Sequence, residues 1–240
     1  MSKSKPKVFV ALDNMTKAES LFSAEAWSSV AAGLKVGPNL GFQLSEVDWK
    51  ILSKNVELFI DYKFFDIPSV VEKSVMRAFD CGASFCTVHA LNGPECLRRL
   101  AALEKKLNET RFFKILSVTV LTSFDQDQNS LPLSQKRPAQ EVVEELAQGV
   151  FESGLTGLVS SAFEVQGLKA KNKDAFLVTP GIRFAGDAVG DQKRVTTPKE
   201  AWAMGSDYIV MGRSLISTTG DAKLFQKAAE NLESEWQAAQ

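Results

Sequence analysis

The chain has 240 residues, 45% of them hydrophobic and 24% charged, and a formal net charge of −1 at pH 7. This size and composition predict one larger globular domain or two small ones, and the small net charge argues against nucleic acid or an anionic membrane as the main partner. The apolar runs fall well short of the about 20 residues that span a bilayer. The basic N-terminus is not followed by an apolar segment of signal-peptide length. The three cysteines (Cys81, Cys86 and Cys96) lack metal-ligand spacing, so we expect reduced thiols in a cytoplasmic protein.

Short apolar runs rich in β-forming residues recur along the whole chain and predict strands. They cover residues 8–12, 33–36, 58–60, 85–88, 115–121, 157–159, 176–179 and 208–211.

Segments with helical spacing separate these runs. Apolar residues within 71–79 and 143–150 recur at three- and four-residue intervals, as on one face of a helix. Thr197 is suited to cap a helix that begins Pro-Lys-Glu, and Gly205 is suited to its end. Eight strands alternating with helices over this length predict a (β/α)₈ TIM barrel. A doubly wound sheet would alternate in the same way, but no Gly-x-Gly-x-x-Gly follows the first strand.

The barrel is expected to be a single domain spanning residues 1–240. No linker, low-complexity tract or charge block marks a second domain. We expect residues 1–6 to form a flexible N-terminal tail. The polar stretch 124–138 is expected to be a loop at the top of the barrel, between the fifth strand and its helix.

The stretch 61–68 reads Asp-Tyr-Lys-Phe-Phe-Asp-Ile-Pro and directly follows the third apolar run. Residues two apart on a strand share a face, so Asp61 and Lys63 should point the same way, with Asp66 just past the strand end. Three charges at the end of a buried element are expensive to desolvate unless they pair. The stretch therefore predicts a functional site that uses the electric field of these three charges.

Polar residues follow nearly every predicted strand, at the end where barrels carry their active sites. They are Asp13, Lys35, Asp61 with Lys63, His89, Thr122 with Ser123, Ser160 with Ser161, Gly181 with Arg183, and Gly212 with Arg213. For His89, the only histidine, a packed structural imidazole is the simpler interpretation, and one histidine cannot build a typical zinc site.

The segments after strands seven and eight predict a phosphate site. Barrels often bind phosphate through these two loops. Arg183 follows the seventh strand, and Gly212 with Arg213 follows the eighth. Glycine lets backbone N–H groups approach an anion, and arginine offers a bidentate fork.

With these features in hand, the chain resembles the orotidine 5′-phosphate decarboxylase family over nearly its full length. The matching motifs are Val-Ala-Leu-Asp at 10–13, Leu-Lys-Val-Gly at 34–37, the stretch 61–68, Val-Thr-Val-Leu-Thr-Ser at 118–123, Val-Thr-Pro-Gly-Ile-Arg at 178–183 and Val-Met-Gly-Arg at 210–213.

The resemblance implies a cofactor-free loss of CO₂ from orotidine monophosphate to give uridine monophosphate (UMP), the last step of de novo UMP biosynthesis. Lys63 would protonate the pyrimidine carbon, Asp61 would face the substrate carboxylate, and Lys35 would join an alternating row of charges that ends at Asp66. In the family the last aspartate enters the site from the partner subunit, so Asp66 implies a homodimer.

The same resemblance implies the substrate contacts, with Gln192 on a closing loop. The expected contacts are Asp13, Lys35, Ile67, Thr122, Ser161, Pro180, Arg183, Gln192, Gly212 and Arg213. Three positions depart from the usual family pattern: Val70 replaces a threonine, Phe65 an often-present histidine, and Ser214 a common proline.

Other functions remain open. A sister barrel that acts on a sugar phosphate through a magnesium-stabilised enediolate also carries Asp-x-Lys-x-x-Asp. A nucleotide-binding barrel that has lost catalysis is a second alternative, although binding would not require the whole charged row. A third alternative is one domain of a larger bifunctional enzyme. The start of the chain at Met1, without a fusion arm, argues against this expectation.

Overall fold

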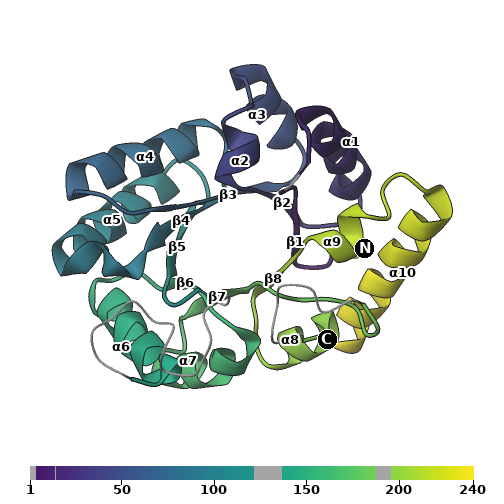
Figure 1. Cartoon of the computed structure of the whole chain (residues 1–240). Helices are drawn as coiled ribbons and strands as arrows, with labels where there is room; N and C mark the ends of the chain where they lie inside the picture. Colours follow the sequence, from purple (N-terminus) through teal and green to yellow (C-terminus); the bar gives the residue numbers. More distant parts are fainter. Residues whose placement is uncertain (1–3, 14, 122–136, 188–195) are drawn as a thin grey trace.

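The computed structural model describes residues 4–13, 15–121, 137–187 and 196–240. In this part of the chain, eight parallel strands close into a barrel in sequence order, with helices forming a ring outside it (Figure 1). The predicted (β/α)₈ barrel is therefore confirmed. The strands are β1 (Val8–Ala11), β2 (Gly33–Val36), β3 (Glu57–Phe64), β4 (Phe85–His89), β5 (Lys114–Val118), β6 (Gly157–Val159), β7 (Phe176–Thr179) and β8 (Tyr208–Met211).

Helices follow the strands and pack against their outer faces. They are α1 (Lys17–Ser28), α2 (Pro38–Gly41), α3 (Glu46–Leu52), α4 (Pro68–Asp80), α5 (Gly93–Asn108), α6 (Ala139–Glu152), α7 (Val165–Lys171), α8 (Pro198–Ala203), α9 (Arg213–Ile216) and α10 (Ala222–Ala238), with the short 3₁₀ helices η1 (Ala90–Asn92) and η2 (Ala162–Glu164). None of these described helices is both long and apolar enough to cross a membrane.

The helix signals read from the sequence are confirmed. Helix α4 buries Val71, Val75 and Ala78 along one face. Helix α8 begins with a capping box: the Thr197 side chain accepts from the backbone N–H of Glu200, and the Glu200 carboxylate accepts from the N–H of Thr197. This reciprocal pairing satisfies two backbone donors that a helix start otherwise leaves without partners.

Aromatic side chains fill the lower half of the barrel. The Phe9 ring lies 4.8 Å from that of Tyr208, 5.0 Å from that of Phe85 and 5.1 Å from that of Phe59. Tyr208 also donates its hydroxyl hydrogen to the Glu57 carboxylate at 2.6 Å. Because these residues occupy the N-terminal parts of their strands, the barrel is closed below and its chemistry is confined to the opposite end.

The N-terminal stretch expected as a tail is partly tied to the barrel. Pro6 is buried, and its carbonyl accepts from the N–H groups of Val8 and Ala32. Lys5 donates to the Ser28 carbonyl at 2.6 Å. A flexible tail stays a prediction for the residues before these contacts, of which 1–3 lie outside the described residues.

Gly157 provides a test of strand packing. A β-carbon there would lie 2.2 Å from the Ile115 carbonyl oxygen on the neighbouring strand, and backbone cannot move aside as a side chain can. Gly157→Ala should lower the free energy of unfolding by roughly 1 to 3 kcal/mol, as overpacking does. Urea denaturation would measure this loss.

Gly149 is the matched control, because it lies inside α6 and a β-carbon added there would meet no atom of another element within 4 Å. Gly149→Ala should stabilise the protein by up to about 1 kcal/mol through helix propensity. Equal denaturation midpoints for wild type and Gly157→Ala would contradict the packing described for β5 and β6.

Candidate active site

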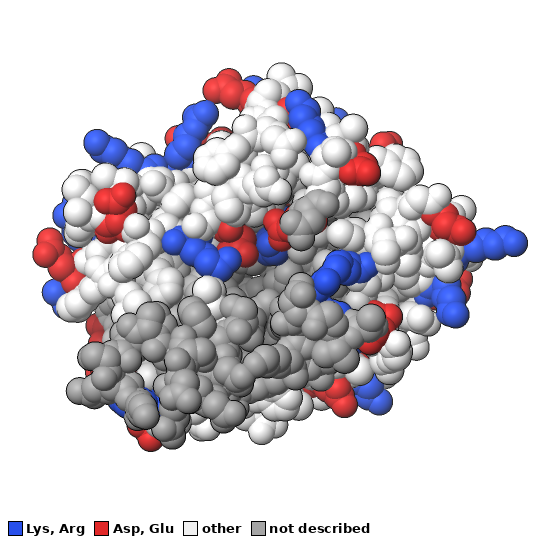
Figure 2. Space-filling view, viewed as in Figure 1, with Lys and Arg blue, Asp and Glu red and all other residues white. Residues whose placement is uncertain are grey.

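Four charged side chains form an alternating row at the mouth of the barrel. Lys35 Nζ lies 2.5 Å from Asp13 Oδ2 and 3.4 Å from Asp61 Oδ2, and Lys63 Nζ lies 2.9 Å from Asp61 Oδ1. Asp61 and Lys63 meet in an ion pair, although the strand that carries them is not regular here. Figure 2 shows acidic and basic side chains meeting around the hollow at the centre of this face. Asp13, expected as a substrate contact, is also the first member of the row.

The row stabilises charges that burial would otherwise suppress. Burial alone would lower the pKa of Lys35, but the carboxylates of Asp61 and Asp13 outweigh it and raise that pKa above its ordinary value. Burial alone would likewise raise the pKa of Asp61, but Lys35 and Lys63 outweigh it and the net shift is downward. Both groups therefore remain ionised at neutral pH.

Strand β3 is irregular where it carries this row. Ile60 pairs with Cys86 and Phe64 with Val88, so β3 advances four residues while β4 advances two. Within this bulge, Lys63 has φ of 50°, in the left-handed region that side chains disfavour. The Thr87 hydroxyl accepts from the Lys63 backbone N–H and donates to Asp61. Thr87 was not predicted from the sequence, because a lone threonine in an apolar strand carries no distinct signal.

Asp66 lies apart from the row within one chain. It is exposed, its carboxylate accepts from the Ile67 N–H at 2.7 Å, and its own N–H donates to the Asn92 side chain. Among the described residues of a single chain, no ion pair joins Asp66 to Lys63. Ile67 is also exposed, with 63% of its surface accessible.

Two connected hollows adjoin the charged row. The first, of about 320 Å³, is lined by the segments that follow β7 and β8, from which Arg183 and Arg213 supply positive charge. The second, of about 190 Å³, is lined by Lys35, Asp61 and Lys63 and otherwise by apolar side chains, among them Phe59. The residues that line both are Lys35, Asp61, Pro180 and Val210. The site therefore joins a part that carries two arginines to a part in which the charged row faces apolar side chains.

The structure brings most of the predicted contacts to this site. Asp13, Lys35, Pro180, Arg183, Gly212 and Arg213 line the first hollow. Thr122 and Gln192 lie outside the described residues. Ser161 is not among the lining residues; its hydroxyl accepts from the Phe163 N–H, and its own N–H donates to Glu164, so it caps η2.

His89 lies beside the row without joining it. Its Nδ1 accepts from the Leu91 N–H at 3.2 Å, and its ring packs 5.5 Å from that of Phe65. Burial and the nearby charge of Lys63 lower its pKa. Among the described residues, no group of three or more His, Cys, Asp and Glu side chains is arranged to hold a metal ion.

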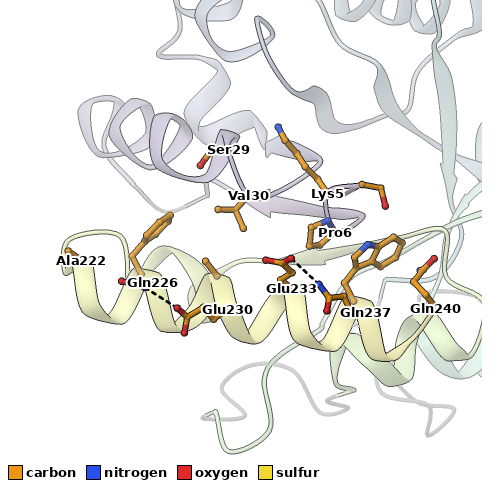
Figure 3. Close-up of a pocket in the computed structure, with 14 residues that line it drawn as sticks. Lys5, Pro6, Ser29, Val30, Ala222, Gln226, Glu230, Glu233, Gln237 and Gln240 are labelled. Carbon is orange, nitrogen blue, oxygen red and sulfur yellow. Dashed lines mark hydrogen bonds between the residues drawn. The ribbon is translucent and has the colours of Figure 1, made fainter. Parts of the chain in front are cut away.

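A larger groove, of about 780 Å³, lies away from these charges, between α10 and the segment that contains Lys5 and Pro6 (Figure 3). Its carboxamides and carboxylates pair with each other along the helix: Gln226 with Glu230, and Gln237 with Glu233. Size alone therefore does not identify the active site; convergent charge does.

Comparisons with known proteins agree on one family. The family model described as "Orotidine 5'-phosphate decarboxylase / HUMPS family" matches residues 6–227. An orotidine 5′-phosphate decarboxylase of Psychromonas ingrahamii is 37% identical over 232 residues, which cover 95% of this chain and 97% of that protein. One of Idiomarina loihiensis is 40% identical over 216 residues, with 88% and 90% covered. The crystal structure of orotidine 5′-phosphate decarboxylase from Lactobacillus acidophilus matches with a TM-score of 0.78 at 29% identity, covering 97% of this chain and 99% of that one.

The lowered pKa of Asp61 predicts how stability depends on pH. Its carboxylate stabilises the fold above the ordinary aspartate pKa of about 3.9, and this contribution is lost as pH falls through the lower folded-state value. The free energy of unfolding of wild type relative to Asp61→Asn should therefore fall as pH decreases below about 4. Denaturant titrations between neutral and acidic pH would measure it. Asp174→Asn supplies the control, because this carboxylate is exposed and no ion pair joins it to another described residue. A constant difference for Asp61→Asn would contradict the charge pairing.

Proposed function

The chain belongs to the orotidine 5′-phosphate decarboxylase / HUMPS family, and on that premise we propose that it converts orotidine 5′-monophosphate to UMP and CO₂ without a cofactor. The observation that carries the proposal is the alternating row of Asp13, Lys35, Asp61 and Lys63 beside a two-part hollow with arginines at one end. A nucleoside monophosphate also has two parts that fit such a hollow, because it carries a dianionic phosphate at one end and a flat ring at the other.

In the proposed complex, the phosphate occupies the first hollow. Arg183 and Arg213 supply charge-assisted hydrogen bonds there, and Gly212 leaves its backbone open to close approach. The pyrimidine then enters the smaller hollow, where it lies between the apolar side chains of the hollow and Lys63. The sugar lies between them, alongside Asp13 and Lys35. Thr122 and Gln192 are proposed as further contacts from segments outside the described residues.

The proposed chemistry is a proton transfer that accompanies bond cleavage. The bond between the ring carbon and the carboxylate breaks, CO₂ leaves, and the electron pair stays on the ring carbon. Lys63 Nζ donates a proton to that carbon and recovers one from solvent, so that one proton is consumed per turnover. The ammonium charge also stabilises the developing carbanion.

Asp61 is proposed to destabilise the bound substrate by repelling its carboxylate. Its carboxylate is held by Lys35, Lys63 and Thr87 and cannot turn away from the substrate carboxylate. Repulsion between the two anions is relieved as CO₂ departs. Very slow reactions require about 20 kcal/mol of barrier reduction, more than one lysine supplies, so binding energy from the distant phosphate must also contribute.

We also propose that the active unit is a homodimer in which Asp66 completes the partner's site. Asp66 lies at an exposed tip and does not reach its own row. Large apolar side chains around this tip are exposed, which in a single chain leaves an unburied patch. They are Phe42, Phe65, Ile67, Val70 and Leu91. Burying this patch against a second copy would bring Asp66 towards the other barrel mouth.

The proposal of a cytoplasmic location rests on the thiols. Cys81, Cys86 and Cys96 are all free cysteines, and Cys86 and Cys96 are buried. Burial raises the pKa of the Cys86 thiol well above its ordinary range, which favours the unreactive protonated form. Unpaired thiols are typical of reducing compartments.

Decarboxylation can be tested directly with purified protein. Incubation with orotidine monophosphate and a chelator should give loss of substrate absorbance and release of CO₂. Lys63→Ala should lower kcat by at least about 100-fold, since general acid catalysis contributes on that scale. Lys105→Ala, at an exposed position on α5, should leave kcat unchanged. Activity that disappears with the chelator and returns with magnesium would instead support the sugar-phosphate alternative.

Subunit mixing tests the shared site. Asp66→Ala and Lys63→Ala chains should each be nearly inactive alone. After subunit exchange, half of the dimers are mixed and each holds one complete site, so about a quarter of wild-type activity should return. Recovery should require exchange, verified with differently tagged chains. No recovery in verified mixed dimers would contradict the shared site.

A further inference from the structure

Two side chains form hydrogen bonds with the bulge in β3. They are Thr87 on β4 and Asn92, which ends the short helix η1 that follows β4. In a regular parallel ladder the backbone of β4 would take the N–H of Lys63. Here the register shift removes that partner, and the Thr87 side chain replaces it at 2.8 Å. Among the described residues, Lys63 is the only non-glycine residue with a positive φ.

The hydrogen-bond directions at Thr87 are unambiguous. A backbone N–H can only donate, and a carboxylate can only accept. The hydroxyl therefore accepts from Lys63 N and donates its one hydrogen to Asp61 Oδ1 at 2.9 Å. The residue is completely buried, so water does not substitute for either bond. One hydroxyl thus links the backbone of Lys63 to the carboxylate with which its ammonium group pairs.

Asn92 makes equally directed contacts at the far end of the bulge. Its side-chain NH₂ donates to the carbonyls of Phe64 at 2.9 Å and His89 at 3.0 Å, and its side-chain oxygen accepts from the Asp66 N–H at 3.3 Å. Both amide hydrogens and the carbonyl are used, which fixes the orientation of the amide. The side chain therefore joins the end of β4 to the segment that leaves β3 at Asp66.

We propose that Thr87 and Asn92 are positioning residues for the decarboxylation, acting on different sites: Thr87 places Lys63 and Asp61 in its own chain's site, and Asn92 places Asp66 for the partner's site. The inference rests on the proposed function and the proposed dimer. Neither residue touches the reacting atoms. Because small displacements of reacting groups are costly, removal of either contact should act mainly on turnover.

Thr87→Val tests the first half, since it preserves the branched shape and removes both hydrogen bonds. We expect kcat to fall by about 10- to 100-fold, while the KM for orotidine monophosphate and the Kd for UMP change less than about twofold, because the phosphate end is untouched. Thr87→Ser restores the hydroxyl and should keep kcat within about threefold of wild type. If Thr87→Val does not fold, Thr87→Cys, with a weak donor and acceptor of similar size, takes its place with the same expectation.

Subunit mixing separates the two roles. Asn92→Ala chains mixed with Lys63→Ala chains should recover activity, because the mixed dimer holds one site with an intact Lys63 and an Asp66 supported by an intact Asn92. Thr87→Val chains mixed with Lys63→Ala chains should not recover it, because both changes damage the Lys63 side of a site. Thr87→Val mixed with Asp66→Ala should recover.

The outcomes distinguish this inference from the proposed function. Wild-type protein without decarboxylase activity would contradict the function itself. An active wild type with Thr87→Val at wild-type kcat would overturn the role of Thr87. Equal losses of kcat in Thr87→Val and Thr87→Ser would overturn it too, because the hydroxyl would then be irrelevant. Recovery in the Thr87→Val and Lys63→Ala mixture, or no recovery in the Asn92→Ala and Lys63→Ala mixture, would overturn the division between sites.

Discussion

The site depends on one arrangement, a largely buried carboxylate held between two ammonium groups. Asp61 accepts from Lys63 and from Thr87 and lies 3.4 Å from Lys35. Without these partners, burial would favour the neutral acid. With them, the carboxylate stays ionised, and each lysine gains a fixed anion that determines where its charge lies. An isolated buried ion would be too costly to retain, and a chain of alternating charges spreads that cost over several pairs.

The barrel supports this arrangement by separating packing from chemistry. Phe9, Phe59, Phe85 and Tyr208 close the lower half, and Phe59 also lines the smaller hollow together with Lys63. Rigid aromatic contacts below therefore limit how far the charged groups above can relax. The irregular segment of β3 loses backbone hydrogen bonds of the regular ladder. Thr87 on β4 and Asn92 in the following turn replace these bonds with their side chains.

The sequence predicted the strands and helices, whose residue patterns repeat or have a known capping signature. It missed features that depend on contacts between residues far apart in the chain. Strand runs follow from periodicity, and the capping box before α8 follows from its residue types. The bulge does not, because Lys63 is an ordinary strand residue by type and its left-handed backbone arises from its neighbours. The pairing of Asp13 with Lys35 was also missed, since it joins the end of β1 to the adjacent strand β2 and no local pattern encodes a contact between residues so far apart in the chain. The roles of Thr122 and Gln192 rest on the resemblance alone.

The exposed apolar patch gives the proposed dimer a thermodynamic link to catalysis. Val70 lacks the hydroxyl expected at its position and instead lines a pocket of about 440 Å³ whose aromatic residues include Phe42, Tyr62 and Phe64. Phe65 similarly packs on His89, next to Asp66. Three of the side chains that a second copy would bury, Phe65, Ile67 and Val70, thus lie on the same segment as Asp66, the carboxylate that it would receive. In such a dimer, subunit association and completion of the site are one equilibrium, so a ligand that requires Asp66 must also strengthen the contact between subunits.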